Sequence, residues 1–241
     1  MNTTARETLA FVRDITIVIL LVILIRTYVF APFAISGHSM ESSFHDGEFI
    51  LVNKWNYAQI APTPSLDLRV GDPKRWDVVV LKPHVSVERQ YYIKRVIGLP
   101  GDTIRISSGA VYLTPVGTNR EVMLDEEAYL NDTNNGNTKF RWDPGTDRFT
   151  VPEDSYWVMG DNRNNSSDSR ECFSMCVPGG ATHFVTRSNI VGKPLFSFGG
   201  IHIEMLPYLN GLIKLPTPVN NLEFRWANIP KEYSYPELGG N

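Results

Sequence analysis

The sequence predicts a mainly β protein preceded by one membrane-spanning helix. Its 241 residues are 42% hydrophobic and 20% charged, a composition typical of a packed globule rather than a disordered chain. Short apolar runs bounded by Gly, Pro, Asn and Asp follow one another along most of the chain, as in all-β proteins. Helical periodicity is weak outside residues 15–25, where the longest apolar run lies.

The predicted membrane helix begins with residues 15–25, ITIVILLVILI. A spanning helix needs about 20 mainly apolar residues, and residues 15–35 supply them only by including Arg26. That arginine costs about 2.5–3.5 kcal/mol at the bilayer centre, while each Ile, Leu or Val of the run returns about 0.3–0.6 kcal/mol. The span is therefore favourable, with the Arg26 side chain reaching toward one membrane face.

Two interpretations of this segment stay open on the residues alone. Arg6 and Arg13 precede the run, and basic residues before a span favour a cytoplasmic N-terminus. The alternative is a cleaved secretory signal, because the short apolar run and the triplet Ala34-Ile35-Ser36 fit that pattern as well. In both interpretations residues 37–241 lie across the membrane from the cytoplasm.

Beyond the membrane segment, a series of apolar runs is predicted to form strands. They are EFILVNKW, WDVVVLK, YYIKRVIGL, DTIRIS, AVYLTP, SYWVMGD and IHIEML. Residues 56–75 contain three prolines and are predicted to form a long loop between two strands. Residues 102–153 carry strand and turn signals of their own, which predicts an insert or second lobe. The polar, proline-dotted residues 214–241 are predicted to form a tail over the surface.

Charge and cysteine content bear on the possible functions. The 23 basic and 26 acidic residues give a net charge of −3, which provides no indication of nucleic-acid binding. Cys172 and Cys176 are too few for a metal site without further ligands, and no metal or cofactor is expected. Whether these two cysteines form a disulfide or stay free thiols is left open.

A serine and a lysine are the candidate catalytic residues. Ser39 lies in the small polar turn after the membrane segment, and a serine nucleophile needs a base. The five histidines show no recognisable acid–base pattern. Lys94 lies in YYIKRVIGL, where an inward-facing lysine would lose solvation and its pKa would fall. Taken alone, each residue fits a structural role better, as a turn serine and a surface lysine.

A second polar loop, VMGDNRNNSSDSR at residues 158–170, follows the apolar run SYWV. By itself this loop fits a solvated turn, but its Gly, Asn and Asp content also suits a loop that holds several side chains in fixed directions.

Together these stretches resemble type I signal peptidases, the membrane-bound Ser-Lys proteases of the bacterial leader peptidase family that release secreted proteins. The resemblance covers about residues 10–198. Four blocks match in order: SGHSM at 36–40, RWDVVVLK at 75–82, YIKRVIGLPGD at 92–102 and GDNRNNSSDSR at 160–170.

The resemblance implies roles for individual residues. Ser39 would be the nucleophile, Lys94 in its neutral form the general base, and Ser166 a hydrogen-bond partner that orients Lys94. The backbone N–H of Ser39 would stabilise the oxyanion, with Ser36 as a candidate second donor. Further residues would hold the polar loop by ion pairs and hydrogen bonds or pack near the site. They are Asp161, Arg163, Asp168, Arg170, Arg95 and Met40.

The resemblance also implies a fold, an antiparallel β catalytic core with a β-rich inserted subdomain. The implied parts are a cytoplasmic N-terminus at 1–14, a transmembrane anchor at 15–35, a catalytic core at 36–102 and 153–213, an inserted subdomain at 103–152, and a C-terminal tail at 214–241. A retained anchor places the protein in the cell (inner) membrane as a single-pass chain, with the catalytic domain on the periplasmic or extracellular face. The expected partners are signal-peptide-bearing preproteins and the lipid bilayer, with no nucleic acid, and the chain is expected to be a monomer.

The chain departs from the family pattern at two places near Ser39. Many members carry serine where this chain has Gly37, which leaves the second oxyanion donor open. After Met40 the family usually has x-Pro-Thr, whereas this chain has Glu41-Ser42-Ser43, which affects the geometry of the turn rather than the chemistry. Residues 171–184 are also longer than the family pattern, and their role is open.

Three other functions remain as alternatives. The first is a Ser-Lys protease specialised for a pilin or conjugation precursor. The second is a catalytically inactive, membrane-tethered β domain that binds exported peptides. The third, a cytoplasmic self-cleaving repressor of similar fold, is disfavoured by residues 15–25.

Overall fold

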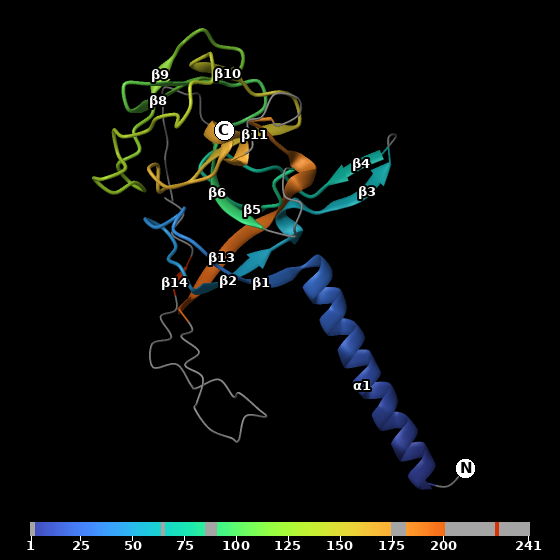
Figure 1. Ribbon diagram of the computed structural model, residues 1–241. Coiled ribbons are helices and arrows are strands. Elements are labelled where there is room, and N and C mark those ends of the chain that lie inside the picture. Colours follow the sequence, from blue (N-terminus) through green and yellow to red (C-terminus); the bar gives the residue numbers. More distant parts are fainter. Residues whose placement is uncertain (1–2, 64–65, 85–90, 175–181, 201–224, 227–241) are drawn as a thin grey trace.

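The computed structural model describes residues 3–63, 66–84, 91–174, 182–200 and 225–226. One long helix, α1, leads away from a β body, and a second, smaller sheet lies at the end of that body remote from the helix (Figure 1). Helical elements are α1 Thr3–Tyr28 and the short 3₁₀ turns η1 Trp55–Tyr57, η2 Ser169–Ser174 and η3 Arg187–Asn189. Strands are β1 Phe30–Ala34, β2 Glu48–Asn53, β3 Gln59–Thr63, β4 Leu66–Arg69, β5 Val78–Leu81, β6 Tyr92–Gly98, β7 Thr103–Ser107, β8 Ala110–Thr114, β9 Val122–Met123, β10 Arg148–Thr150, β11 Ser155–Met159, β12 Val185–Thr186, β13 Ile190–Gly200 and β14 Arg225–Trp226.

Helix α1 is long and apolar enough to cross a membrane. Its segment Arg6–Tyr28 has 23 residues, and an 18-residue stretch within it has a mean hydropathy of 2.5 and is exposed in the described structure. At 1.5 Å per residue this segment is about 35 Å long, which matches a hydrocarbon core of about 30 Å. Thr16 carries the one hydroxyl in the apolar run 15–25, and this hydroxyl donates a hydrogen bond to the carbonyl of Val12 at 2.8 Å.

The helical boundaries differ from the range 15–35 assigned from sequence. The helix begins near the N-terminus and ends at Tyr28, and residues 30–34 form β1 instead. Pro32 cannot continue a helix, and it restricts the residue before it to extended backbone. The side chain of Lys54 donates to the carbonyl of Thr27 at 2.5 Å, which satisfies an acceptor at the helix end and ties α1 to the sheet.

The main sheet is antiparallel, as predicted, and has the strand order β1-β2-β13-β5-β6-β11-β12 among the described residues, with β14 pairing β13. Strands β2, β5, β6 and β11 fall in four of the predicted runs, which confirms them. The structure adds β13, the longest strand, which lies between β2 and β5. Its glycines and Pro194 hid it from sequence reasoning, and irregular register near Pro194 shows how the sheet accommodates that proline.

The second sheet, β10-β7-β8-β9, is drawn from residues 103–150. Strands β7 and β8 confirm the runs DTIRIS and AVYLTP. The two sheets share one hydrophobic core, because Ile104 and Leu113 of the second sheet pack in a cluster with Ile97 and Trp157 of the main sheet. The smaller sheet is therefore fixed to the main one by buried apolar contact.

The loop predicted at residues 56–75 is wrong in part, because β3 and β4 form a two-stranded antiparallel ribbon there. Both strands of such a ribbon are edges, so Pro62 can be accommodated without losing a ladder bond. The predicted strand IHIEML lies outside the described residues, as does the predicted tail apart from β14.

Candidate active site

Ser39 lies in a loop, residues 36–47, that connects the paired strands β1 and β2. The base of the loop is closed by two backbone hydrogen bonds, from the N–H of Ile35 to the carbonyl of Glu48 at 2.8 Å and from Gly47 to Ile35 at 3.0 Å. Met40 and Phe44 are each 1% exposed and anchor the loop in a core cluster beneath it. The loop is therefore held at its base and at its apolar side chains, and the half-buried Ser39 is fixed between them.

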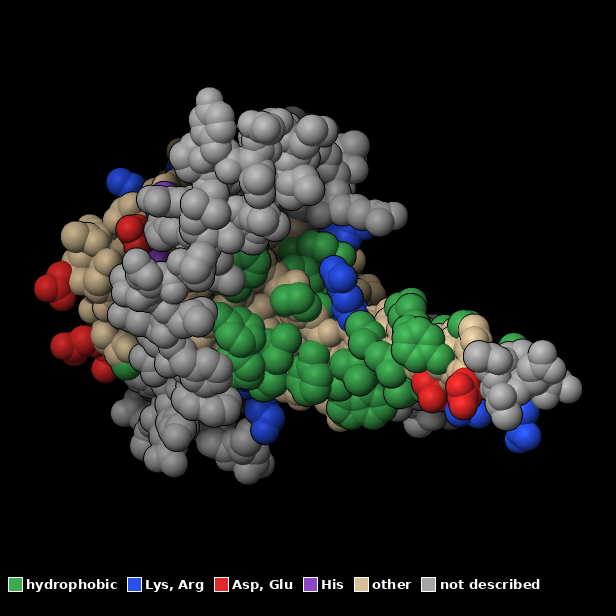
Figure 2. All heavy atoms as spheres, turned by 90° about the horizontal axis from the view of Figure 1, so that it is seen from below, with side chains coloured by type: hydrophobic (Ala, Val, Ile, Leu, Met, Phe, Trp, Pro, Cys, Tyr) green, Lys and Arg blue, Asp and Glu red, His purple; other side chains and the backbone are tan. Residues whose placement is uncertain are grey.

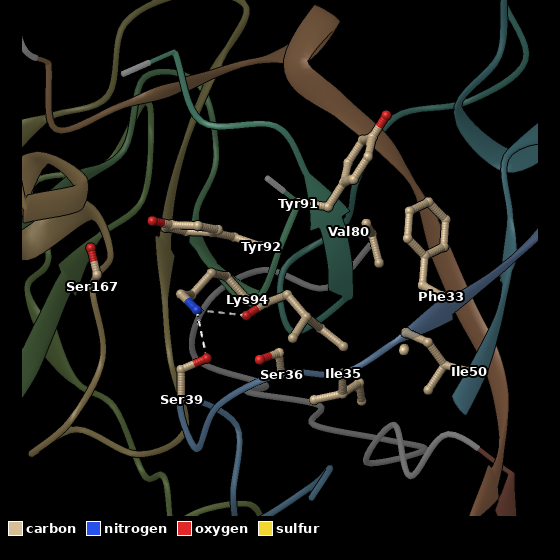
Figure 3. A pocket seen from close by; sticks show the side chains of 12 residues that line it. Phe33, Ile35, Ser36, Ser39, Ile50, Val80, Tyr91, Tyr92, Lys94 and Ser167 are labelled. Carbon is tan, nitrogen blue, oxygen red and sulfur yellow. Dashed lines mark hydrogen bonds between the residues drawn. The ribbon is translucent and has the colours of Figure 1, made fainter. Parts of the chain in front are cut away.

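Lys94 lies on β6, a strand with neighbours on both sides and a buried stretch from Lys94 to Gly98. The side chain is 3% exposed. Its Nζ donates to Oγ of Ser39 at 2.7 Å and to the carbonyl of Ile93 at 2.8 Å (Figure 3). Ser39 and Lys94 are 55 positions apart in the chain, and the fold of the sheet brings them together.

Burial lowers the pKa of the Lys94 amine from 10.5 to about 8, because desolvation disfavours its charged form. The carboxylates of Asp168 and Asp161 oppose this shift, and the guanidinium of Arg170 adds to it. With a pKa of about 8, roughly a tenth of the lysine is neutral at pH 7, and forming the base costs about 1.4 kcal/mol instead of about 5 kcal/mol for a solvated lysine.

A cavity of about 510 Å³ opens beside this pair. Ser36, Ser39, Lys94 and Ser167 line one part of it, and apolar side chains from β1, β2, β5 and the start of β6 line the rest (Figure 3). The apolar lining residues include Phe33, Ile35, Ile50, Val80, Tyr91 and Ile93. Seen from below, apolar side chains run along α1 and continue onto the adjoining part of the β body (Figure 2).

The polar loop after β11 is held to β6 by a buried ion pair, and to the loop that carries Ser39 by hydrogen bonds. Arg95 donates through Nε and NH2 to the two carboxylate oxygens of Asp161 at 2.8 and 2.7 Å, and both side chains are almost fully buried. The hydroxyl of Ser43 joins this pair, donating to Asp161 at 2.5 Å and accepting from Arg95 at 3.0 Å. The backbone N–H of Asn162 also donates to the carbonyl of Ser39 at 3.0 Å.

A second buried ion pair shapes the far part of the same loop. Arg170 donates to both oxygens of Asp168 at 2.9 and 2.8 Å, and the N–H of Gly160 donates to the same carboxylate at 2.9 Å. Burial alone would raise the pKa of Asp168, but Arg170, together with the N–H of Gly160 and the Ser166 hydroxyl, outweighs it and holds that pKa below its usual value. Asp168 is therefore ionised at neutral pH and can hold the loop closed.

The remaining predicted site residues are placed as follows. Met40 packs beneath the serine loop, its sulfur accepting from the N–H of Asp161 at 3.4 Å. Ser36 is exposed and lines the cavity. Arg163 lies apart from the serine and lysine and pairs with Glu126. The hydroxyl of Ser166 is buried beside the carboxylate of Asp168, whose pKa it lowers, and the predicted bond to Lys94 is not formed in this geometry.

The profile of the family described as signal peptidase, peptidase S26, matches residues 8–198, most of the chain. The chain belongs to this family. Signal peptidase I of Bacillus amyloliquefaciens is 35% identical over 79% of this chain and 87% of its own length. Signal peptidase I of Pseudomonas aeruginosa is 34% identical over 73% of this chain and 67% of its own, and signal peptidase I S of Bacillus subtilis is 32% identical over 80% and 90%.

Two residues that contact the signal peptidase motifs were missed by sequence reasoning. Ser43 stands where the family usually has threonine, so its hydroxyl was a usable signal. Glu126 belongs to no motif and lies 37 residues before its partner Arg163, so no pattern in the sequence indicated it. Cys172 is disulfide-bonded, while Cys176 lies outside the described residues.

Two adjacent serines of the serine loop should respond differently to substitution. Ser43→Ala removes a hydrogen bond from the buried Asp161 and Arg95, and we expect it to lower the free energy of unfolding by about 1–3 kcal/mol. Ser42→Ala is the matched control, because the Ser42 hydroxyl is buried without a partner. The control should be as stable as the parent protein or more stable. Chemical unfolding in detergent measures both, and equal destabilisation would contradict the bonding described for Ser43.

Proposed function

We propose that this signal peptidase family member removes signal peptides from preproteins by a Ser39–Lys94 dyad. The observation that carries the proposal is the 2.7 Å contact between a buried amine and a hydroxyl at the side of an apolar cavity. A lysine with a pKa of about 8 is a competent general base near neutral pH, and serine is a nucleophile only when such a base accepts its proton.

In the acylation step, neutral Lys94 Nζ takes the proton of Ser39 Oγ as that oxygen attacks the scissile carbonyl. The C–N bond then breaks, the departing amine takes the proton from the Lys94 ammonium, and the mature protein leaves. In the deacylation step, Lys94 takes a proton from water, and the hydroxide formed attacks the ester carbon. Ser39 regains its proton from Lys94, and the signal peptide leaves as a carboxylic acid that ionises by releasing its proton to water. The proton balance closes without a cofactor or metal.

The oxyanion formed in each step needs hydrogen-bond donors. We propose the backbone N–H of Ser39 as one donor and the hydroxyl of Ser36, which lines the same cavity, as the second. The conformation at Gly37, with φ of +96°, turns the chain between these two residues. Its N–H donates to Asp46 at 2.6 Å, which fixes that turn.

Ser166 is proposed to orient the base during turnover. A Cβ added at Gly160 would lie 2.2 Å from the Ser166 hydroxyl oxygen and 2.5 Å from the Ser39 carbonyl oxygen, so both groups crowd the same glycine. We propose that this buried hydroxyl, which lies beside the carboxylate of Asp168, rotates toward Lys94 when Ser39 is acylated. The ion pairs of Asp161 with Arg95 and of Asp168 with Arg170 are proposed to hold this loop in place.

The substrate segment is proposed to bind as an added strand. Among the described residues β1 stands at the end of the main sheet and pairs only with β2, so its other edge can accept an extended peptide. Alternate side chains of that peptide would enter the apolar cavity next to Ser39. A signal peptide ends in a small-x-small sequence, which suits such a site.

We further propose a single-pass chain in the cell (inner) membrane. The N-terminal end of α1 would face the cytoplasm and the β body would lie on the outer face, as a monomer in contact with the bilayer. Arg6 and Arg13 at the start of α1 support this direction, since basic residues favour the cytoplasmic side. Residues 36–102 and 153–213 would form the catalytic core, and 103–152 the inserted subdomain.

Substitution of either dyad residue should abolish cleavage of a purified preprotein by the purified enzyme. Ser39→Ala removes the nucleophile and Lys94→Met removes the base. Lys94→Met is expected to stay folded, because it replaces an amine whose burial opposes its charge. Lys82→Met, an exposed lysine after β5, is the matched control and should cleave normally. Sequencing the new N-terminus of the product identifies the cleaved bond, and full cleavage by Lys94→Met would refute the dyad. A panel including pilin precursors separates general from specialised processing.

The pH dependence of kcat/KM should report the lysine. Only neutral Lys94 accepts a proton, so the rate is expected to rise about tenfold per pH unit below its pKa and to level off above pH 8. The apparent pKa of this acidic limb is expected near 8. A limb that continues to rise up to pH 10 would mean that the base is a solvated lysine, in conflict with the buried site.

The direction of the chain in the membrane can be measured with single cysteines in a background lacking Cys172 and Cys176. A cysteine at Asn2 should be shielded from a membrane-impermeant thiol reagent added to intact cells or spheroplasts. A cysteine at Val116, which is exposed on the insert, should be labelled. The opposite labelling pattern would overturn the proposed topology.

A further inference from the structure

Arg163 of the polar loop after β11 has a buried counter-ion that lies outside the family motifs, in the inserted segment. Glu126 lies between β9 and β10, and its carboxylate accepts from Arg163 at 2.7 Å through NH1 and at 2.5 Å through NH2. Arg163 is 3% exposed and Glu126 is 4% exposed. A buried guanidinium without a carboxylate would be an uncompensated charge, so the position of Arg163 depends on Glu126.

Arg163 transmits this constraint to the backbone next to the nucleophile. Its Nε donates to the carbonyl of Gly160 at 3.2 Å. Gly160 leaves no room for a Cβ because the carbonyl of Ser39 and the hydroxyl of Ser166 lie against it. A displacement of Arg163 would therefore move the glycine that packs on Ser39.

The same part of the insert also reaches the strand that carries Lys94. The hydroxyl of Tyr129 donates to Glu126, and its ring lies under the guanidinium of Arg95, 4.3 Å from the ring centre. Arg95 is adjacent to Lys94 on β6. Glu126 therefore contacts Arg163 of the polar loop, and Tyr129 contacts Arg95 of β6.

Further hydrogen bonds tie the insert to the outer part of the loop. The backbone N–H of Asn164 donates to the side-chain oxygen of Asn134 at 3.2 Å, and the Asn164 amide donates to the carbonyl of Thr133 at 2.9 Å. Arg170 donates to the carbonyls of Lys139 and Arg163 at 3.1 and 2.8 Å. Segment 126–139 thus holds the loop at several points, with the Glu126–Arg163 pair at its buried centre.

We propose that Glu126 is a positioning residue for the peptidase reaction, holding Gly160 against Ser39 through Arg163. This inference rests on the proposed Ser39–Lys94 function. According to this proposal, the inserted segment helps to fix the position of the polar loop that packs on Ser39. Because Glu126 acts through Arg163 and Gly160 on the nucleophile and is not one of the residues that line the cavity, its loss should reduce kcat and leave KM for the preprotein nearly unchanged.

The test compares two glutamates of the same insert in the full-length enzyme in detergent micelles. Glu126→Gln keeps the size of the side chain and removes its charge. Glu121→Gln is the matched control, since Glu121 is partly exposed and pairs with Arg105 and Arg148 away from the loop. For Glu126→Gln we expect kcat to fall at least tenfold with KM within twofold, and for Glu121→Gln no change in either. A wild-type kcat in folded Glu126→Gln would overturn the proposal.

A structural readout separates positioning from general destabilisation. Amide hydrogen exchange in residues 160–168 should become faster in Glu126→Gln, while exchange in β7 and β8 of the insert stays slow. Equal acceleration throughout the insert would overturn the proposal in favour of a purely structural role. Hydrogen exchange does not depend on turnover, so it still tests the Glu126–Arg163 contact if the wild-type protein cleaves no preprotein. Failure of the wild-type protein to cleave would refute the proposed function instead.

Tyr129→Phe provides a milder variant in case Glu126→Gln does not fold. It keeps both charges and the ring under Arg95, and removes only the hydroxyl that donates to Glu126. We expect a several-fold loss of kcat at constant KM, with faster exchange confined to residues 160–168. Wild-type kcat and wild-type exchange in this variant would contradict the proposal.

Discussion

The arrangement of the site depends on one buried amine. Lys94 lies on β6 with strands on either side, and its Nζ reaches the hydroxyl of Ser39. Desolvation lowers its pKa to about 8, against two nearby carboxylates that raise it. Each carboxylate is paired with an arginine, Asp161 with Arg95 and Asp168 with Arg170. Arg170 therefore does more than shape the loop, because its positive charge also lowers the pKa of Lys94.

The location of the serine follows from the short connection between α1 and the sheet. The chain leaves the helix at Tyr28, forms β1 at once and enters the serine loop directly after it. Lys54 fixes the helix end by donating to the carbonyl of Thr27. With α1 as a membrane anchor, the cavity beside Ser39 would open close to the membrane surface. There it could bind an apolar peptide whose other end is inserted in the bilayer.

The two sheets are coupled rather than independent. They share a buried cluster in which Ile104 and Leu113 contact Ile97 and Trp157, and β6 and β11 carry those last two residues. The same two strands lead to Lys94 and to the polar loop. The proposed role of Glu126 adds a buried ion pair with Arg163 to this apolar packing. Such an ion pair fixes the orientation of the two side chains as well as the distance between them.

The sequence by itself determined the strands with clear alternation and the apolar helix, whereas the residues around Lys94 left its burial open. It also supplied Ser39 and Lys94 as a pair through family motifs. Only the tertiary structure decided that Phe30–Ala34 and Ile190–Gly200 are strands, since their prolines conceal the signal and β2 pairs with both. It alone decided the partners of Ser43 and Arg163. Local sequence indicates the conformational preference of a backbone segment, whereas contacts between distant residues depend on the order and pairing of the strands in the folded chain.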